Sequence, residues 1–161
     1  MTPSSPRMHR LTLSLVASCL PAILAAAGGC ADNRASGLYR LAVGNAVATV
    51  EVAAEPLARA TGLSGRRSLE NDRGMLFLFP EETSAQFWMK GTYVPLSIAF
   101  VTSGGQIAEI QDMAPETLDR HGPERPYRMA LEMPAGWFAE KGVRPGDRVS
   151  LPPEVAKMPV R

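Results

Sequence analysis

Apolar and polar side chains alternate in short runs from residue 38 onward, as they do in β-strands that have one face in water. The clearest run is Ala46–Ala53, and Gly44-Asn45 separates it from Leu38–Val43 as a hairpin turn does. Gly74–Phe79 is instead apolar at every position after its glycine, which predicts a strand buried on both faces. The other expected strands are Ala85–Lys90, Leu96–Thr102, Gln106–Met113, Tyr127–Met133 and Arg148–Leu151.

Two segments break the alternation and follow helical spacing. Glu55–Leu63 has Pro56 where the first turn of a helix tolerates proline, and Gly62 can end that helix. Ala135–Lys141 can form one or two further turns. Because about eight short strands are expected without long helices between them, the predicted fold is mainly β: an antiparallel β-sandwich or partly open barrel with one or two short helices.

The first 29 residues differ in character from the rest of the chain. Arg7 and Arg10 precede Leu11–Ala27, a run without charge, and small residues follow it. This order predicts a secretory signal peptide. The alternative is a permanent transmembrane anchor, but the run lies at the lower edge of the ~17–25 residues that a span needs and contains Pro21. The expected organisation is a signal peptide at 1–29, a short tether at 30–36, a β domain at 37–151 and a proline-rich C-terminal tail at 152–161 that trails off.

The two cysteines bear on location. Ala27-Gly28-Gly29-Cys30 resembles the lipobox of bacterial lipoproteins, in which the cysteine becomes the lipidated first residue. Val16-Ala17-Ser18-Cys19 is a competing match, and cleavage without lipid is a third possibility. We expect a bacterial envelope protein, periplasmic or extracytoplasmic, anchored to a membrane through a lipid on Cys30. The sequence does not decide between inner and outer membrane. If Cys19 is removed, no cysteine pair is left for an internal disulfide.

Charge and composition exclude several classes of partner. Loss of Arg7 and Arg10 from the 17 basic residues leaves 15 against 16 acidic ones, a net charge of −1. A near-neutral domain lacks the concentrated positive surface that nucleic acid requires. No phosphate-binding glycine motif or calcium loop is present, and His121 is the one histidine beyond residue 29, which excludes a histidine-based metal cluster. We therefore expect no nucleic-acid partner, no metal and no cofactor, and a solvated loop position for His121.

Several motifs together resemble the DUF192 family, also called UPF0127, over about Val50 to Leu151. The resemblance implies a bacterial or archaeal protein, often exported, with a fold similar to small β-sandwiches; the family has no established activity. The motifs, in chain order, are Gly62-Leu63-Ser64-Gly65-Arg66-Arg67-Ser68-Leu69, Gly74-Met75-Leu76-Phe77, Phe87-Trp88-Met89-Lys90, Pro95-Leu96 and Pro145-Gly146-Asp147.

Two positions depart from the family pattern. Gly91 stands where the family usually has asparagine after Phe-Trp-Met-Lys, and Ser97 stands where it usually has aspartate after Pro-Leu. If those polar groups belong to a shared site, this chain has lost an amide and a carboxylate from it.

Four residues are the candidates for ligand binding. Trp88 and Lys90 are two apart in an extended segment and therefore share a face, where an aromatic ring beside an ammonium suits an anionic ligand with a flat or apolar part. Arg66 lies in a family motif and offers a guanidinium fork for carboxylate or phosphate. Glu132 lies between apolar neighbours, so it either faces water or pairs with a cation such as Lys90 or Arg66 when buried. Each pattern also has an ordinary structural explanation, in which Trp88 covers the core edge and the charges form surface pairs.

The leading functional hypothesis is a non-catalytic module that binds an envelope ligand or a protein partner. No catalytic residue is assigned, and the absence of a nucleophile elbow favours a binding module over an enzyme. One alternative is a glycan-acting hydrolase or transferase that uses acids such as Glu109, Asp112 and Asp147. Another is a structural accessory of an envelope complex. The ligand and the oligomeric state are not written in the sequence.

Overall fold

The computed structural model describes Met1 and residues 37–161. The rest of the predicted signal peptide, the expected lipidation site at Cys30 and the expected tether lie outside the described residues. Among the residues that the structure describes, no helix combines the length and the apolar character needed to cross a membrane.

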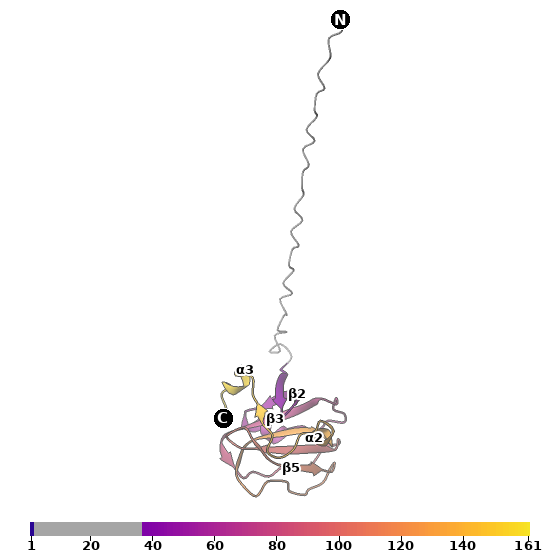
Figure 1. Cartoon of the computed structure of the whole chain (residues 1–161). Coiled ribbons are helices and arrows are strands. Elements are labelled where there is room, and N and C mark those ends of the chain that lie inside the picture. Colours follow the sequence, from indigo (N-terminus) through magenta and orange to yellow (C-terminus); the bar gives the residue numbers. More distant parts are fainter. Residues whose placement is uncertain (2–36) are drawn as a thin grey trace. The chain divides into compact units, whose positions relative to one another are not determined.

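Within residues 37–161 the chain forms one curled sheet with three short helices (Figure 1). This confirms the prediction of a mainly-β, partly open barrel with short helices. The strands are β1 (Tyr39–Val43), β2 (Ala46–Ala53), β3 (Arg73–Thr83), β4 (Leu96–Val101), β5 (Ile107–Met113), β6 (Tyr127–Pro134) and β7 (Val149–Ser150), and the helices are α1 (Pro56–Thr61), α2 (Trp137–Glu140) and α3 (Pro153–Ala156).

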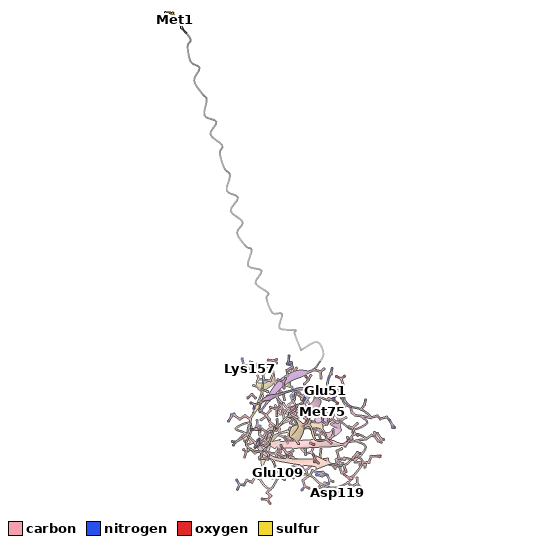
Figure 2. The ribbon with its side chains drawn as sticks, turned by 45° about the vertical axis from the view of Figure 1, so that its right-hand side comes forward. Met1, Glu51, Met75, Glu109, Asp119 and Lys157 are labelled. Carbon is pink, nitrogen blue, oxygen red and sulfur yellow. The ribbon has the colours of Figure 1, made fainter. Side chains whose placement is uncertain are left out.

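The strands lie in the order β5-β4-β6-β3-β2-β1-β7. One neighbouring pair, β2 and β3, is parallel, and every other pair is antiparallel. A parallel pair needs a crossover connection, which α1 and the loop after it supply. Glu51 of β2 and Met75 of β3 are register partners in this pair and are labelled in Figure 2.

Hydrogen bonds between the two ends of the sheet curl it into a half-barrel. The Val149 N–H of β7 donates to the carbonyl of Gly105, in the turn between β4 and β5, at 2.8 Å. The Ile107 N–H of β5 donates in turn to the carbonyl of Asp147, just before β7, at 2.8 Å. Both edges of the sheet are therefore partly paired, which limits the unpaired backbone that they expose.

Each face of the sheet carries its own apolar core. The inner core contains side chains from both edge strands, Ile107 of β5 and Val149 of β7, together with Trp137 of α2. The outer core contains Phe77, Phe100 and Ala130, with Met89 packed over them. Central strands therefore bury both sets of alternating side chains, which confirms the expectation for the apolar run at the start of β3.

Two segments differ from the sequence-based expectations. Ala85–Lys90 is not a strand of the sheet, because it crosses the outer core as a cover and makes only a single bridge, between Phe87 and His121. The chain beyond Leu151 does not trail off. It forms α3, where Val155 is 1% exposed within the inner core, and the Arg161 N–H donates to the Ala54 carbonyl at 3.1 Å.

Candidate functional site

A pocket of about 520 Å³ opens on the outer face of the sheet. Its floor comes from β3 and β6, and its walls come from the end of α1 with residues 62–64 and from the covering segment 85–92. We call it the β3–β6 pocket. Its volume lies within the range of ~300–1,000 Å³ that is usual for small-molecule sites.

Glycines let the two walls meet. Gly65 donates its N–H to the Gly91 carbonyl at 2.8 Å, and Tyr93 donates its N–H to the Arg66 carbonyl at 3.3 Å. Gly91 has a φ of 69°, in the left-handed region. Asparagine is among the residues that best tolerate this region, so backbone geometry explains why Gly91 can stand where the family usually has asparagine.

The covering segment is fixed from both sides. Met89 is 1% exposed within the outer core, and the Tyr127 hydroxyl donates to the Ala85 carbonyl at 2.7 Å. Phe87 and His121 exchange backbone hydrogen bonds of 2.8 and 2.9 Å. The wall of the pocket is thus held in place by contacts within the domain itself.

Aromatic rings line much of the pocket. Phe77 and Phe87 meet edge to face with ring centroids 5.0 Å apart, and Phe87 reaches Phe100 in the same manner at 6.0 Å. Phe79 and Trp88 complete the aromatic lining. These rings offer a large apolar surface with a negative face, which suits a ligand with an apolar or flat body.

Glu132 lies on the floor of the pocket and is 5% exposed. Its register partners are Met75 on β3 and Ile98 on β4, so both neighbours in its row are apolar. Within residues 37–161 its carboxyl takes part in no ion pair or hydrogen bond. Burial raises the pKa of this carboxyl to about 8. The cationic partner expected for it, Lys90 or Arg66, is not there.

Trp88 and Lys90 lie at the exposed rim. The indole is 43% exposed, and the Lys90 ammonium lies 5.6 Å from the centre of its ring. The Arg120 guanidinium is closer, 4.1 Å from the same ring. The predicted pairing of Trp88 with Lys90 on one face is therefore present, and Arg120 joins it from a loop that the sequence did not single out.

Arg66 is placed elsewhere. It lines a more open recess of about 530 Å³ beside α1 and β2. There its guanidinium makes hydrogen bonds of 2.6 and 2.8 Å to the two carboxylate oxygens of Glu51. The structure thus brings Trp88, Lys90 and Glu132 to one pocket and leaves Arg66 outside its lining.

Ser97 lies on the opposite face of the sheet from Glu132. Its hydroxyl donates to the Asp112 carboxylate at 2.5 Å and accepts the Gly136 N–H at 2.9 Å, at the start of α2. Gly91 and Ser97 therefore do not share a site. The replacement of aspartate by Ser97 does not alter the lining of the β3–β6 pocket.

The acidic residues considered for glycan hydrolysis are not gathered around this pocket. Asp112 bonds to Ser97, Glu109 accepts a hydrogen bond from Gln111 at 2.6 Å, and Asp147 accepts the Arg144 N–H at 2.9 Å. Glu132 is the one acid in the lining of the β3–β6 pocket. In the part of the chain that the structure describes, no three potential metal ligands come together.

Sequence reasoning missed two features of the site. Phe77 and Phe87 of the lining lie within the family motifs, but the convergence of the lining phenylalanines depends on the covering segment crossing the sheet. His121 is half-buried, and its Nε2 is buried without a hydrogen-bond partner among the described residues, so the expected solvated loop histidine is wrong. Its burial follows from the bridge to Phe87, which a single sequence does not reveal.

Comparison with known proteins gives a consistent picture. The family model DUF192, described as an uncharacterised ACR, matches residues 39–151. A crystal structure from Sinorhizobium meliloti 1021, described provisionally as a transcription regulator, is 36% identical with a TM-score of 0.67, covering 71% of this chain and 93% of that one. A protein of unknown function from Novosphingobium aromaticivorans DSM 12444 is 28% identical with a TM-score of 0.66, covering 70% and 84%. No curated protein matches.

Proposed function

Because the chain belongs to the DUF192 family, whose description assigns no activity, we propose a function from the site itself: a non-catalytic module that binds a small ligand in the β3–β6 pocket. The observation that carries the proposal is a preformed aromatic pocket with an unpartnered, buried carboxyl on its floor. Burial of the Glu132 carboxyl without a hydrogen-bond partner costs free energy, and a ligand that forms a hydrogen bond with it would offset this cost.

The rim and the floor of the pocket suit different chemical groups of a ligand. Lys90 lies at the exposed rim beside Trp88, which suits an anionic group on a ligand that stacks against the indole. Phe77, Phe79 and Phe87 suit an apolar body between rim and floor. Covalent catalysis or paired-carboxylate hydrolysis has no support here, because the lining holds a single acid and no activated nucleophile.

The cellular setting belongs to the same proposal. Residues 1–29 would direct export, and a lipid on Cys30 would hold the domain at a membrane, as the sequence order of charge, apolar run and small residues supports. Palmitate labelling of the chain in a bacterial host tests this. Label that is lost in Cys30→Ser supports it, and label that persists in that variant overturns it.

A thermal-shift screen of the whole chain tests ligand binding. The panel contains peptidoglycan fragments, sugars, nucleotides, carboxylates and amino acids. A ligand at about 100 times its Kd adds about 2.7 kcal/mol of stability, a rise in Tm of several degrees. We expect Trp88→Ala and Lys90→Ala to abolish the rise.

Two matched controls separate the pocket from the general surface. Tyr93 is exposed to nearly the same extent as Trp88, 41% against 43%, but does not line the pocket. Lys157 is an exposed lysine at the end of α3 and does not line the pocket. Tyr93→Ala and Lys157→Ala should leave the shift unchanged. A flat panel would overturn the small-ligand function and leave a protein partner as the role to pursue.

A further inference from the structure

Glu132 occupies a position that stability alone does not favour. It lies in β6, with β3 on one side and β4 on the other, near the middle of the sheet. Its row across the sheet runs Glu51, Met75, Glu132, Ile98, Gln111. The two carboxyls of this row have contrasting surroundings, because Glu51 is half-exposed and paired with Arg66 whereas Glu132 is buried and unpaired.

The cations that line the pocket are engaged elsewhere. Arg59 donates from Nη1 to the carbonyls of Ala54 at 2.7 Å and Leu78 at 3.0 Å, and its guanidinium lies 5.2 Å from the centre of the Phe79 ring. Lys90 lies over Trp88 at the rim. No other charged side chain lines the pocket, so Glu132 faces Arg59 from α1 and Lys90 from the covering segment without bonding to either.

The chemistry of the floor selects a cation. A buried carboxylate is stabilised best by a donor that carries positive charge, because the attraction between the two charges adds to the hydrogen bond in offsetting desolvation. Aromatic rings around the same space attract an ammonium through their negative faces. Phe77 and Phe87 supply such rings in the same lining as Glu132.

We propose, building on the binding function above, that the Glu132 carboxylate holds the ammonium group of the ligand. With an anionic group at the Lys90 rim and an apolar stem along the phenylalanines, the ligand class is a small zwitterion whose amine points inward. Burial raises the pKa of the unliganded Glu132 carboxyl to about 8, so amine binding at pH 7 requires that carboxyl to lose its proton to solvent.

Three probes of equal chain length test the proposal by isothermal titration calorimetry on the whole chain: 6-aminohexanoate, hexylamine and hexanoate. Glu132→Gln should weaken 6-aminohexanoate and hexylamine by roughly 10- to 100-fold, the loss of one hydrogen bond to a charged group, and leave hexanoate unchanged. The control is Glu51→Gln, which changes the other acid of the same row and should leave all three affinities unaltered.

Proton release on binding is a second measurement, and it would not change if Glu132 had only a structural role. Titrations at pH 7 in phosphate and in Tris, which differ in ionisation enthalpy, should show close to one proton released per hexylamine bound to the unmodified chain. The Glu132→Gln variant should release none.

The outcomes separate this inference from the binding function. Amine binding that depends on Glu132 and releases a proton supports both. Hexanoate binding equal to that of 6-aminohexanoate, with no loss in Glu132→Gln, overturns the amine assignment and keeps the pocket. If none of the three probes binds, the amine assignment is overturned. The binding function is overturned only if the thermal-shift panel is flat as well.

Discussion

Replacement of Glu132 by glutamine should stabilise the protein, and the gain should grow with pH. Glutamine has nearly the same shape as glutamic acid but never ionises. Glu132 is 5% exposed on the floor of the pocket and has no hydrogen-bond partner among the described residues, so its carboxyl carries most of the cost of desolvation when charged.

The magnitude follows from the pKa. Burial raises the Glu132 pKa from 4.5 to about 8. The folded state therefore binds its proton more tightly than the unfolded state, and stability falls as pH rises between these two values. Each pH unit in this window removes ~1.4 kcal/mol, so the unmodified protein loses about 3 kcal/mol by pH 7 and about 5 kcal/mol by pH 9 relative to pH 4.

Urea unfolding of both proteins at pH 5, 6, 7, 8 and 9 measures the effect. Other groups titrate equally in both proteins, so the difference in unfolding free energy between them isolates Glu132. We expect that difference to be small at pH 5 and to increase in favour of the glutamine variant until about pH 8. A difference that stays constant from pH 5 to pH 9 would show that Glu132 is already paired or hydrated, and would refute the account of its burial.

Three further predictions concern the framework of the site. Gly74→Ala should destabilise the protein by roughly 4 kcal/mol or more, since the added Cβ would lie 2.1 Å from the Glu132 carbonyl oxygen. Gly104→Ala should be near neutral in the same urea assay, because its added Cβ would meet Thr102 Oγ1 at an ordinary 3.7 Å. Tyr127→Phe should cost about 1 kcal/mol and speed hydrogen exchange in the covering segment, because it removes the bond to the Ala85 carbonyl; unchanged exchange there would argue against that anchor. Hydrogen bonds from Trp137 and then Lys141 lower the pKa of the Asp72 carboxyl, so its contribution to folding stability is present above its unfolded-state pKa and is lost as pH falls through its folded-state pKa. Carbon-detected NMR titration should place the titration midpoint of Asp72 below that of ordinary aspartates. The Trp137→Phe variant should move this midpoint upward.

The sequence predicted much of the sheet because the strands have strong local signals. The limits of β2 agree with the expected run, and α1 begins at the proline that suits a first turn. The segment Ala85–Lys90 misled the prediction because an extended chain that covers a core alternates in the same way as a strand. Alternation reports which side chains are buried, and it does not report whether neighbouring backbones pair.

By itself, the sequence determined the mainly-β fold, the family motifs and the presence of Trp88, Lys90 and Glu132 as chemistry-bearing residues. These follow from periodicity and residue type, which are local properties. Only the tertiary structure decided that Glu132 is buried without a partner, that Arg66 pairs with Glu51 beside α1, and that the phenylalanines of β3 and the covering segment enclose one pocket. Such outcomes depend on which segments cross a given face of the sheet, and that is set by packing between residues far apart in the chain.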